Sequence, residues 1–472
     1  MINYIKNIPS KYEIIFTIVI SFSLWFSIGT KIQLNENFIK EIISKNTLNN
    51  LRFIFPFIIL FFCLVRNRFN KQISKIFFLT TLLIFFSYLI GYLNFYFVNT
   101  NYVDQFLIDK DLIKTGYLPN KIRDIFFCFY FLITFLILTT LKPNQIKLIN
   151  ILNYCFITLV SCITLYYSYM EYINTNKAFL YYSNFLVDGE ILGVASIRSL
   201  GLARNLLICA IPLIIYNLFY NKNTFIKYFL NILIIIFLAN LFQTQSRVSI
   251  FSSYLFILIM FLVCLISRNY KKLLSIFLIT ILLPSLLSLS IPKIKSLYFE
   301  DVKIESRVFT SNPNNIKTEK KIDGIYINDV DEFINIYSSG RLELWKKTLN
   351  VILYEDKFKF RLIGFGPLSD RYFLKENSSN AMIFVLFSGG LLGFFSLILL
   401  YLFTLNEIFK YILNIKHKQS ELFGFSIISI IIFILIRSLV ENSFLVFGTD
   451  HIIFFSGLLY LTNKNKEFKT IN

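Results

Sequence analysis

Histidine is nearly absent from this chain, and charged residues are scarce. Of its 472 residues only His417 and His451 are histidines, and 16% are charged. No cluster of His and Cys side chains can therefore hold zinc. The cysteines are spaced neither as a disulfide framework nor as a metal site, and all six fall inside apolar runs: Cys63, Cys128, Cys155, Cys162, Cys209 and Cys264. We expect no metal and no cofactor.

Apolar residues are in excess. Hydrophobic residues make up 56% of the chain and aromatic residues 18%, which is more than a soluble protein of this size needs for its core. The apolar run near residues 14–28 is followed by no small-residue cleavage site, so we expect an uncleaved first span rather than a signal peptide. The sequence predicts an all-α polytopic membrane protein.

Long apolar runs recur along the chain. A helix that crosses a bilayer needs about 20 mostly apolar residues. Such runs predict about twelve transmembrane helices, of which the second is short and the last two are closely joined. They lie near residues 13–29, 51–65, 76–98, 124–141, 148–168, 202–220, 225–243, 248–267, 273–292, 380–404, 422–440 and 443–461.

The distribution of Lys and Arg predicts the orientation. With the N-terminus in the cytoplasm, the inner segments carry about 19 basic and about three acidic residues, as the positive-inside rule requires. Both termini are then cytoplasmic. Residues 1–292 hold nine helices, 293–379 form one large periplasmic loop, and 380–472 hold three helices and a cytoplasmic tail. The formal net charge of +19 is then mostly a topology signal that can also meet anionic lipid, and nucleic acid is not an expected partner.

The second part of the large loop carries a helix pattern. Ser339 is placed to cap a helix, and Leu342, Trp345, Leu349 and Ile352 then follow at helical spacing on one face. We expect an amphipathic helix that lies on the membrane surface or against the bundle.

Several arginines lie on the predicted outer side, at a span entry, in a short turn or in the large loop. They are Arg198, Arg204, Arg247, Arg341 and Arg371. An ionisable group at a span is costly and usually faces a cavity or a partner. Converging guanidiniums suit a pyrophosphate, because each can bind phosphate oxygens with two N–H groups. The alternative is that each arginine reaches the lipid head groups or pairs with a nearby carboxylate.

Glycines and carboxylates near the outer face leave alternatives open. Gly364 and Gly366 could approach an anion through backbone N–H groups, but a turn before Pro367 is the favoured interpretation. Close helix packing is favoured for the glycines between Gly389 and Gly393. One outer carboxylate could act as a general base, although solvated loop charge is the favoured interpretation for each of them. The candidates are Asp188, Glu190, Glu343, Asp370 and Glu441.

Taken in order, these motifs resemble the O-antigen ligase/polymerase superfamily of membrane glycan transferases. The resemblance covers roughly residues 195–460. It is carried by Arg198-x-x-Gly201 with Asn205, Gln245-Ser246-Arg247, Arg341-x-x-x-Trp345, Gly364-Phe365-Gly366, and Ser379-Asn380 followed by Gly389-Gly390-Leu391-Leu392-Gly393.

The resemblance implies a metal-independent glycosyltransferase in the bacterial inner membrane. Its donor is a glycan linked to polyprenyl pyrophosphate, and no nucleotide takes part. Arg247 and Arg341 match the two arginines expected to hold the pyrophosphate, as the catalytic pair. Further substrate contacts are implied for Arg198, Arg204, Asn205, Arg371, Ser379 and Asn380.

The residue at position 379 directs the choice within this family. Ligases typically carry His where this chain has Ser379, so polymerisation of O-antigen or related repeat units is favoured, with a chain-length regulator as a further candidate partner. A ligase that moves glycan to lipid A core or to protein is the alternative enzyme. A polysaccharide transporter or flippase is the alternative of another class, and it would be expected to show internal repeats and interrupted helices.

Overall fold

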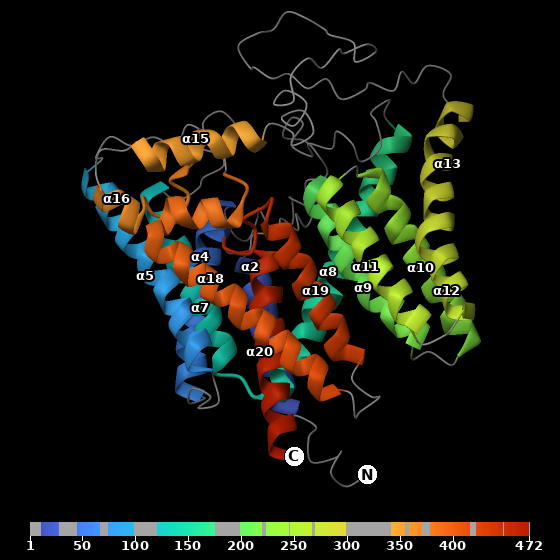
Figure 1. The fold of residues 1–472 in the computed structure, drawn as a ribbon, viewed down its shortest axis with the longest axis horizontal. Helices are drawn as coiled ribbons and strands as arrows, with labels where there is room; N and C mark the ends of the chain where they lie inside the picture. The colour runs from blue at the N-terminus through green and yellow to red at the C-terminus, as the bar shows by residue number, and fades with distance from the viewer. Residues whose placement is uncertain are drawn as a thin grey trace, which may run out of the picture.

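Every regular element of the computed structural model is helical within the residues that it describes (Figure 1). These residues are 11–27, 45–66, 74–98, 120–174, 199–219, 223–244, 246–266, 270–298, 341–354, 358–370, 378–415, 422–446 and 448–471. The helices are α2 (Lys11–Ser27), α4 (Lys45–Arg66), α5 (Lys75–Val98), α7 (Asn120–Thr139), α8 (Pro143–Asn174), α9 (Ser199–Phe219), α10 (Thr224–Gln243), α11 (Arg247–Ile266), α12 (Tyr270–Phe277), the π-helix η2 (Leu278–Leu282), α13 (Leu283–Tyr298), α15 (Arg341–Tyr354), α16 (Phe358–Ile363), α18 (Ala381–Ile415), α19 (Leu422–Ser438) and α20 (Thr449–Ile471).

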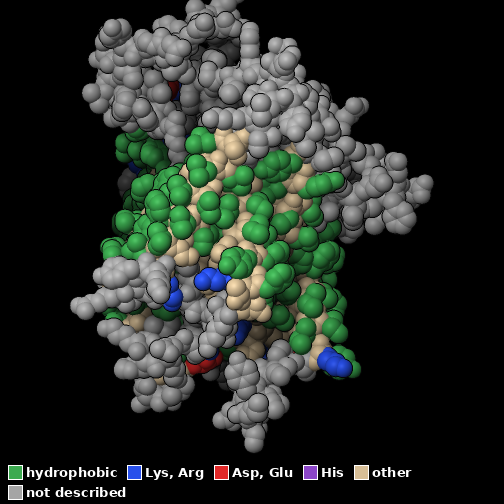
Figure 2. All heavy atoms as spheres, turned by 90° about the vertical axis from the view of Figure 1, so that its right-hand side faces the viewer, with side chains coloured by type: hydrophobic (Ala, Val, Ile, Leu, Met, Phe, Trp, Pro, Cys, Tyr) green, Lys and Arg blue, Asp and Glu red, His purple; other side chains and the backbone are tan. Residues whose placement is uncertain are grey.

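Apolar helices define a helical membrane protein. Within the described residues, five stretches are long and apolar enough to cross a bilayer: Lys75–Phe95, Pro143–Tyr166, Thr224–Gln243, Lys272–Ser290 and Ala381–Asn414. The remaining predicted spans include five shorter apolar helices, so the total of twelve stays a prediction. Figure 2 shows one face of the bundle covered by hydrophobic side chains, as a surface in contact with lipid should be.

Helices occupy the expected runs with small shifts, apart from the last one. The pattern predicts a span over 443–461, but α20 begins only at Thr449. The preceding residues 439–446 form turns, and Phe444 and Leu445 are buried. Irregular backbone is tolerated at this depth because it is enclosed by protein rather than by lipid. The first turn of α20 contains Asp450, whose negative charge is favourable at a helix N-terminus.

Aromatic side chains fill the centre of the bundle. Phe77 of α5 stacks on Phe403 of α18 and on Phe455 of α20, with ring centroids 5.5 and 5.7 Å apart. Phe135 of α7 packs edge-on against Phe77 at 5.0 Å. These contacts join four helices that are distant in sequence, and each aromatic pair adds about 0.5–1.5 kcal/mol beyond the area it buries.

The long helix α18 is broken at Gly390. This residue has φ 62° and ψ −159°, outside the helical region. The break is closed by the turn after α16, where the N–H groups of Phe365 and Gly366 donate to the carbonyls of Phe387 and Ser388 at 2.9 and 2.8 Å. Gly364 and Gly366 therefore form a turn, as favoured from the sequence, and the N–H groups of residues 365 and 366 already bind backbone oxygens.

The predicted surface helix exists as α15, which lies across one end of the bundle, with the C-terminal end of α20 at the opposite end (Figure 1). We refer to these as the α15 end and the opposite end. The face of α15 that is most buried is centred on Leu344, Thr348 and Ile352. The predicted face therefore shares Ile352 with the observed one but is displaced around the helix. Ile352 packs in a small core with Phe365 and Phe387, which ties α15 to the break in α18.

Candidate functional site

A chain of ion pairs links α15 to the interior of the bundle. The Arg341 guanidinium lies 3.3 Å from one carboxylate oxygen of Glu441, and the Arg437 guanidinium lies 3.4 Å from the other. Arg437 is also 3.9 Å from Asp450, whose second oxygen is 3.3 Å from Arg204. We call these five residues the ion-pair chain.

Local structure places each member. Arg437 and Glu441 are one turn apart at the end of α19, where the N–H of Glu441 donates to the carbonyl of Arg437 at 2.9 Å. Asn380 fixes this turn, because its side-chain amide donates to the carbonyl of Leu439 at 2.6 Å. The Asn380 side-chain oxygen also accepts from the N–H of Ile383 at 3.0 Å, which caps the start of α18.

The inner part of the ion-pair chain is buried. Asp450 has no exposed surface, and the Arg437 side chain is 6% exposed. Nη1 and Nε of Arg437 have no hydrogen-bond partner among the described residues. In the described ion pairs, three guanidiniums face two carboxylates. Arginines held in this way in a low-dielectric region attract an added anion more strongly than arginines in water would.

The Arg341–Glu441 part is partly open instead. The Arg341 and Glu441 side chains are 23% and 21% exposed. Partly exposed pairs are screened by water and contribute little to stability. An anion that approaches from the α15 end therefore meets the weaker part of the ion-pair chain first.

The structure brings four of the eight predicted site residues together. Arg204 and Arg341 belong to the ion-pair chain, and the side-chain oxygen of Asn205 accepts from Nε of Arg204 at 3.0 Å. Asn380 adjoins it through Leu439. Ser379 precedes Asn380 with a positive φ of 41°.

Three other predicted residues have side chains outside the described part of the chain. Arg247 begins α11, but the conformation of its side chain lies outside the described part of the chain. Arg198 and Arg371 lie outside the described residues. The pairing of Arg247 with Arg341 on one anion therefore stays a prediction.

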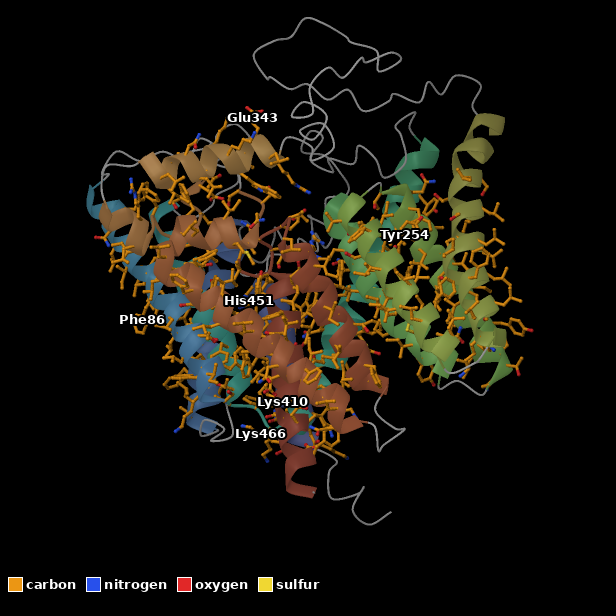
Figure 3. All side chains as sticks on the ribbon, in the orientation of Figure 1. Phe86, Tyr254, Glu343, Lys410, His451 and Lys466 are labelled. Carbon is orange, nitrogen blue, oxygen red and sulfur yellow. The ribbon has the colours of Figure 1, made fainter. Side chains whose placement is uncertain are left out.

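Sequence reasoning missed Arg437 and Asp450. Both lie in runs that the apolar pattern predicts as spans, 422–440 and 443–461. The signal that could have found them is the rarity of charge inside such a run, since an intramembrane ionisable residue usually marks a functional site. His451 adjoins Asp450 and is fully buried, with Nδ1 3.0 Å from the carbonyl of Phe444. Figure 3 shows it within the bundle, whereas Glu343 stands on α15 at the edge.

The candidate carboxylates fall into distinct environments. Glu343 is 54% exposed and pairs with Lys347 at 2.8 Å on the same helix. Asp370 is buried, and it accepts from the backbone N–H and the hydroxyl of Ser378 at 2.8 and 3.0 Å. Glu441 alone of the described three is both partly exposed and held between two arginines. Asp188 and Glu190 lie outside the described residues.

An apolar cavity lies beside the ion-pair chain. Its volume is about 290 Å³, close to the lower limit of typical small-molecule sites. Three of the four helices that line it also carry members of the ion-pair chain: Ile208 lies one turn along α9 from Arg204, and Ile453 lies one turn along α20 from Asp450. Tyr216, also in the lining, is 42% exposed, so the cavity extends to the outside of the bundle.

Polar side chains in the cavity wall are satisfied by the protein. The Trp25 indole donates to Asn153 at 2.9 Å, and Ser456 donates to Asn150 at 3.0 Å. The amide of Asn150 in turn donates to the backbone carbonyl of Ser456 at 3.0 Å. Because these groups bond to one another, the cavity favours a hydrocarbon chain over a polar ligand.

Comparison with known proteins adds no assignment. Neither the protein-family models nor the curated protein sequences contain a match to this chain. Within the described residues no group of three His, Cys, Asp or Glu side chains is placed to hold a metal ion. The fold and the site define a helical membrane protein with a partly buried arginine cluster beside an apolar cavity.

Proposed function

We propose that this protein polymerises oligosaccharide repeat units linked to polyprenyl pyrophosphate, on the periplasmic face of the bacterial inner membrane. The observation that carries the proposal is the position of the apolar cavity one helical turn from Arg204 and Asp450. A lipid with an anionic head needs this combination, because its phosphates require guanidiniums and its tail requires a hydrocarbon environment.

In the proposed reaction, the terminal sugar hydroxyl of one lipid-linked unit attacks the anomeric carbon of another. The new glycosidic C–O bond forms as the bond from the anomeric carbon to the pyrophosphate oxygen breaks. The electron pair leaves with the polyprenyl pyrophosphate. Arg247 and Arg341 stabilise the negative charge that grows there, in the manner of an oxyanion hole. No step in this reaction requires a metal or a nucleotide.

Two substitutions on α15 test the proposal. Arg341→Ala should abolish chain extension, since removal of one such donor typically costs about 100-fold or more in rate. Lys347→Ala is the matched control, because Lys347 is on the same helix and pairs there with Glu343, four residues away. The length of the glycan ladder is measured in the bacterium, with the amount of membrane protein checked by immunoblot. Long-chain glycan at the normal level in Arg341→Ala would contradict the proposal.

Gene deletion separates polymerase from ligase. Loss of a polymerase leaves single repeat units attached to their final acceptor. Loss of a ligase leaves polymer stranded on its carrier lipid. We expect the first outcome, because Ser379 stands where ligases of the resembling family typically carry His.

Transport of a lipid-linked glycan is the second candidate, and one observation favours it. Transporters bind substrate at interrupted helices, and α18 is broken at Gly390 while the chain before α20 is not helical. Purified protein in vesicles distinguishes the two functions. A polymerase lengthens lipid-linked units that are supplied on one side only, whereas a flippase moves them across without lengthening them.

A further inference from the structure

We infer that, in the protein without substrate, the Glu441 carboxylate occupies the position that the substrate's pyrophosphate takes on binding. The bound pyrophosphate displaces Glu441, and Glu441 then acts as the general base. This inference rests on the proposed function and adds a residue to it. Glu441 is one carboxylate with its two oxygens on two different guanidiniums, Arg341 and Arg437. A phosphate that bridged the same two arginines would place its oxygens in the same positions.

The incoming pyrophosphate would displace Glu441 rather than Asp450. The pair that Glu441 makes with Arg341 is partly exposed, so its loss costs little. Asp450 has no exposed surface and is shared by two guanidiniums, so its displacement would leave buried charges unpaired. An incoming pyrophosphate therefore competes with Glu441 while Asp450 continues to hold Arg204 and Arg437 in place.

Displacement gives the carboxylate a second role. Glu441 has its backbone in the last turn after α19, so the side chain can leave the arginines while it stays at the α15 end. The acceptor hydroxyl loses its proton as its oxygen bonds to the anomeric carbon. That proton passes to a carboxylate oxygen of Glu441, and the bond to pyrophosphate breaks with its electron pair. The carboxylate is available as a base only after a substrate has bound.

Among the described carboxylates at this end, the alternatives are placed less well. Glu343 points away on the exposed side of α15 with Lys347. Asp370 is buried and holds the backbone at Ser378. In their described contacts, neither carboxylate pairs with a member of the ion-pair chain. A general base must first lie within reach of the proton that it removes.

Glu441→Gln tests the inference, because it keeps the shape of the side chain and removes its charge. Binding of farnesyl pyrophosphate to the full-length protein in nanodiscs should become tighter, by up to about fivefold, since the internal competitor is gone. Turnover of a lipid-linked repeat unit should fall about 100-fold or more, since the base is gone. If Glu441 had a purely structural role, the Glu441→Gln variant would lose both binding of farnesyl pyrophosphate and turnover.

Control variants make the outcome decisive. Glu343→Gln should match the wild type in both measurements. Glu441→Asp keeps the charge, so part of the turnover should return, and this measurement decides the matter if Glu441→Gln does not fold. Wild-type turnover in Glu441→Gln, or weaker binding of farnesyl pyrophosphate with no loss of rate, would overturn the inference. If Arg341→Ala also turns over normally, the proposed function itself fails, whereas a defect in Arg341→Ala alone rejects only the role of Glu441.

Discussion

The two ends of the bundle hold their charges in different ways. At the α15 end, arginines from three helices share two carboxylates, and only the Arg437–Glu441 pair lies within one turn of the same segment. At the opposite end, two lysines pair with a glutamate three residues away on the same helix, Lys410–Glu407 and Lys464–Glu467 at 2.8 and 2.7 Å, although Lys142 before α8 pairs with Glu13 of α2. Local lysine pairs on a helix need no tertiary structure, whereas an arginine network forms only when the fold brings its members together.

At the opposite end, polar side chains connect neighbouring helices. Asn465 of α20 donates to the backbone carbonyl and to the carboxylate of Glu407 on α18, at 2.9 and 2.8 Å. Burial lowers the pKa of the Lys466 ammonium, and the charge of Glu407 raises it in opposition. Glu407 is therefore shared by Lys410 of its own helix and Asn465 of α20, which joins α18 to α20 at this end.

Removal of Asp450 should have the largest effect on stability. Asp450→Ala leaves Arg204 and Arg437 buried without a carboxylate between them, and breaking a buried pair costs about 3–5 kcal/mol. We expect a large drop in the thermal unfolding temperature in detergent, measured by size-exclusion chromatography after heating. A variant that unfolds like the wild type would show that the two arginines are solvated, and the contrast between the ends would fail.

The second largest effect on stability is expected for alanine substitution of a glycine, and it should be larger at the α15 end than at the opposite end. At Gly390 an added Cβ would stand 2.4 Å from the backbone of Leu362, and φ is 62°. Gly390→Ala should therefore destabilise the protein by about 1–3 kcal/mol from the backbone conformation alone. At Gly424 the added Cβ would meet the hydroxyl end of the Tyr411 side chain at 1.7 Å.

The side chain of Tyr411 can rotate away more readily than a backbone can shift, so Gly424→Ala should cost less than Gly390→Ala. Unfolding temperatures of the two variants, measured side by side, provide the check. An equal drop in unfolding temperature for both variants would mean that the turn after α16 adapts as easily as one tyrosine side chain.

Much of the fold was predictable because bilayer physics acts on local sequence. A run such as 76–98 must be helical to satisfy its backbone in lipid, and α5 spans Lys75–Val98. The late start of α20 was not predictable in this way, since residues 443–448 are apolar enough to pass for helix. Their turns depend on burial by neighbouring helices and on contacts such as Ser443 with Asp450.

The site was predictable in part for the same reason. Arg204 at the entry of a predicted span and Arg341 at the start of the predicted surface helix are predicted site residues, and both belong to the ion-pair chain. Their connection runs through Arg437 and Asp450, which no local pattern joins to them. Which helices pack together is decided by tertiary contacts such as those of α9 with α19. The sequence could supply the members but not the pairing.

Removal of the Lys464 side chain should have the smallest effect on stability and activity. Lys464 pairs with Glu467 along α20, and both side chains are partly exposed, at 24% and 45%. Such a pair contributes less than about 1 kcal/mol, so Lys464→Ala should shift the unfolding temperature by only a few degrees. Chain extension should be unchanged, because Lys464 is at the end opposite α15. A loss of activity comparable with that of Arg341→Ala, at normal protein level, would mean that charge at both ends takes part in the reaction.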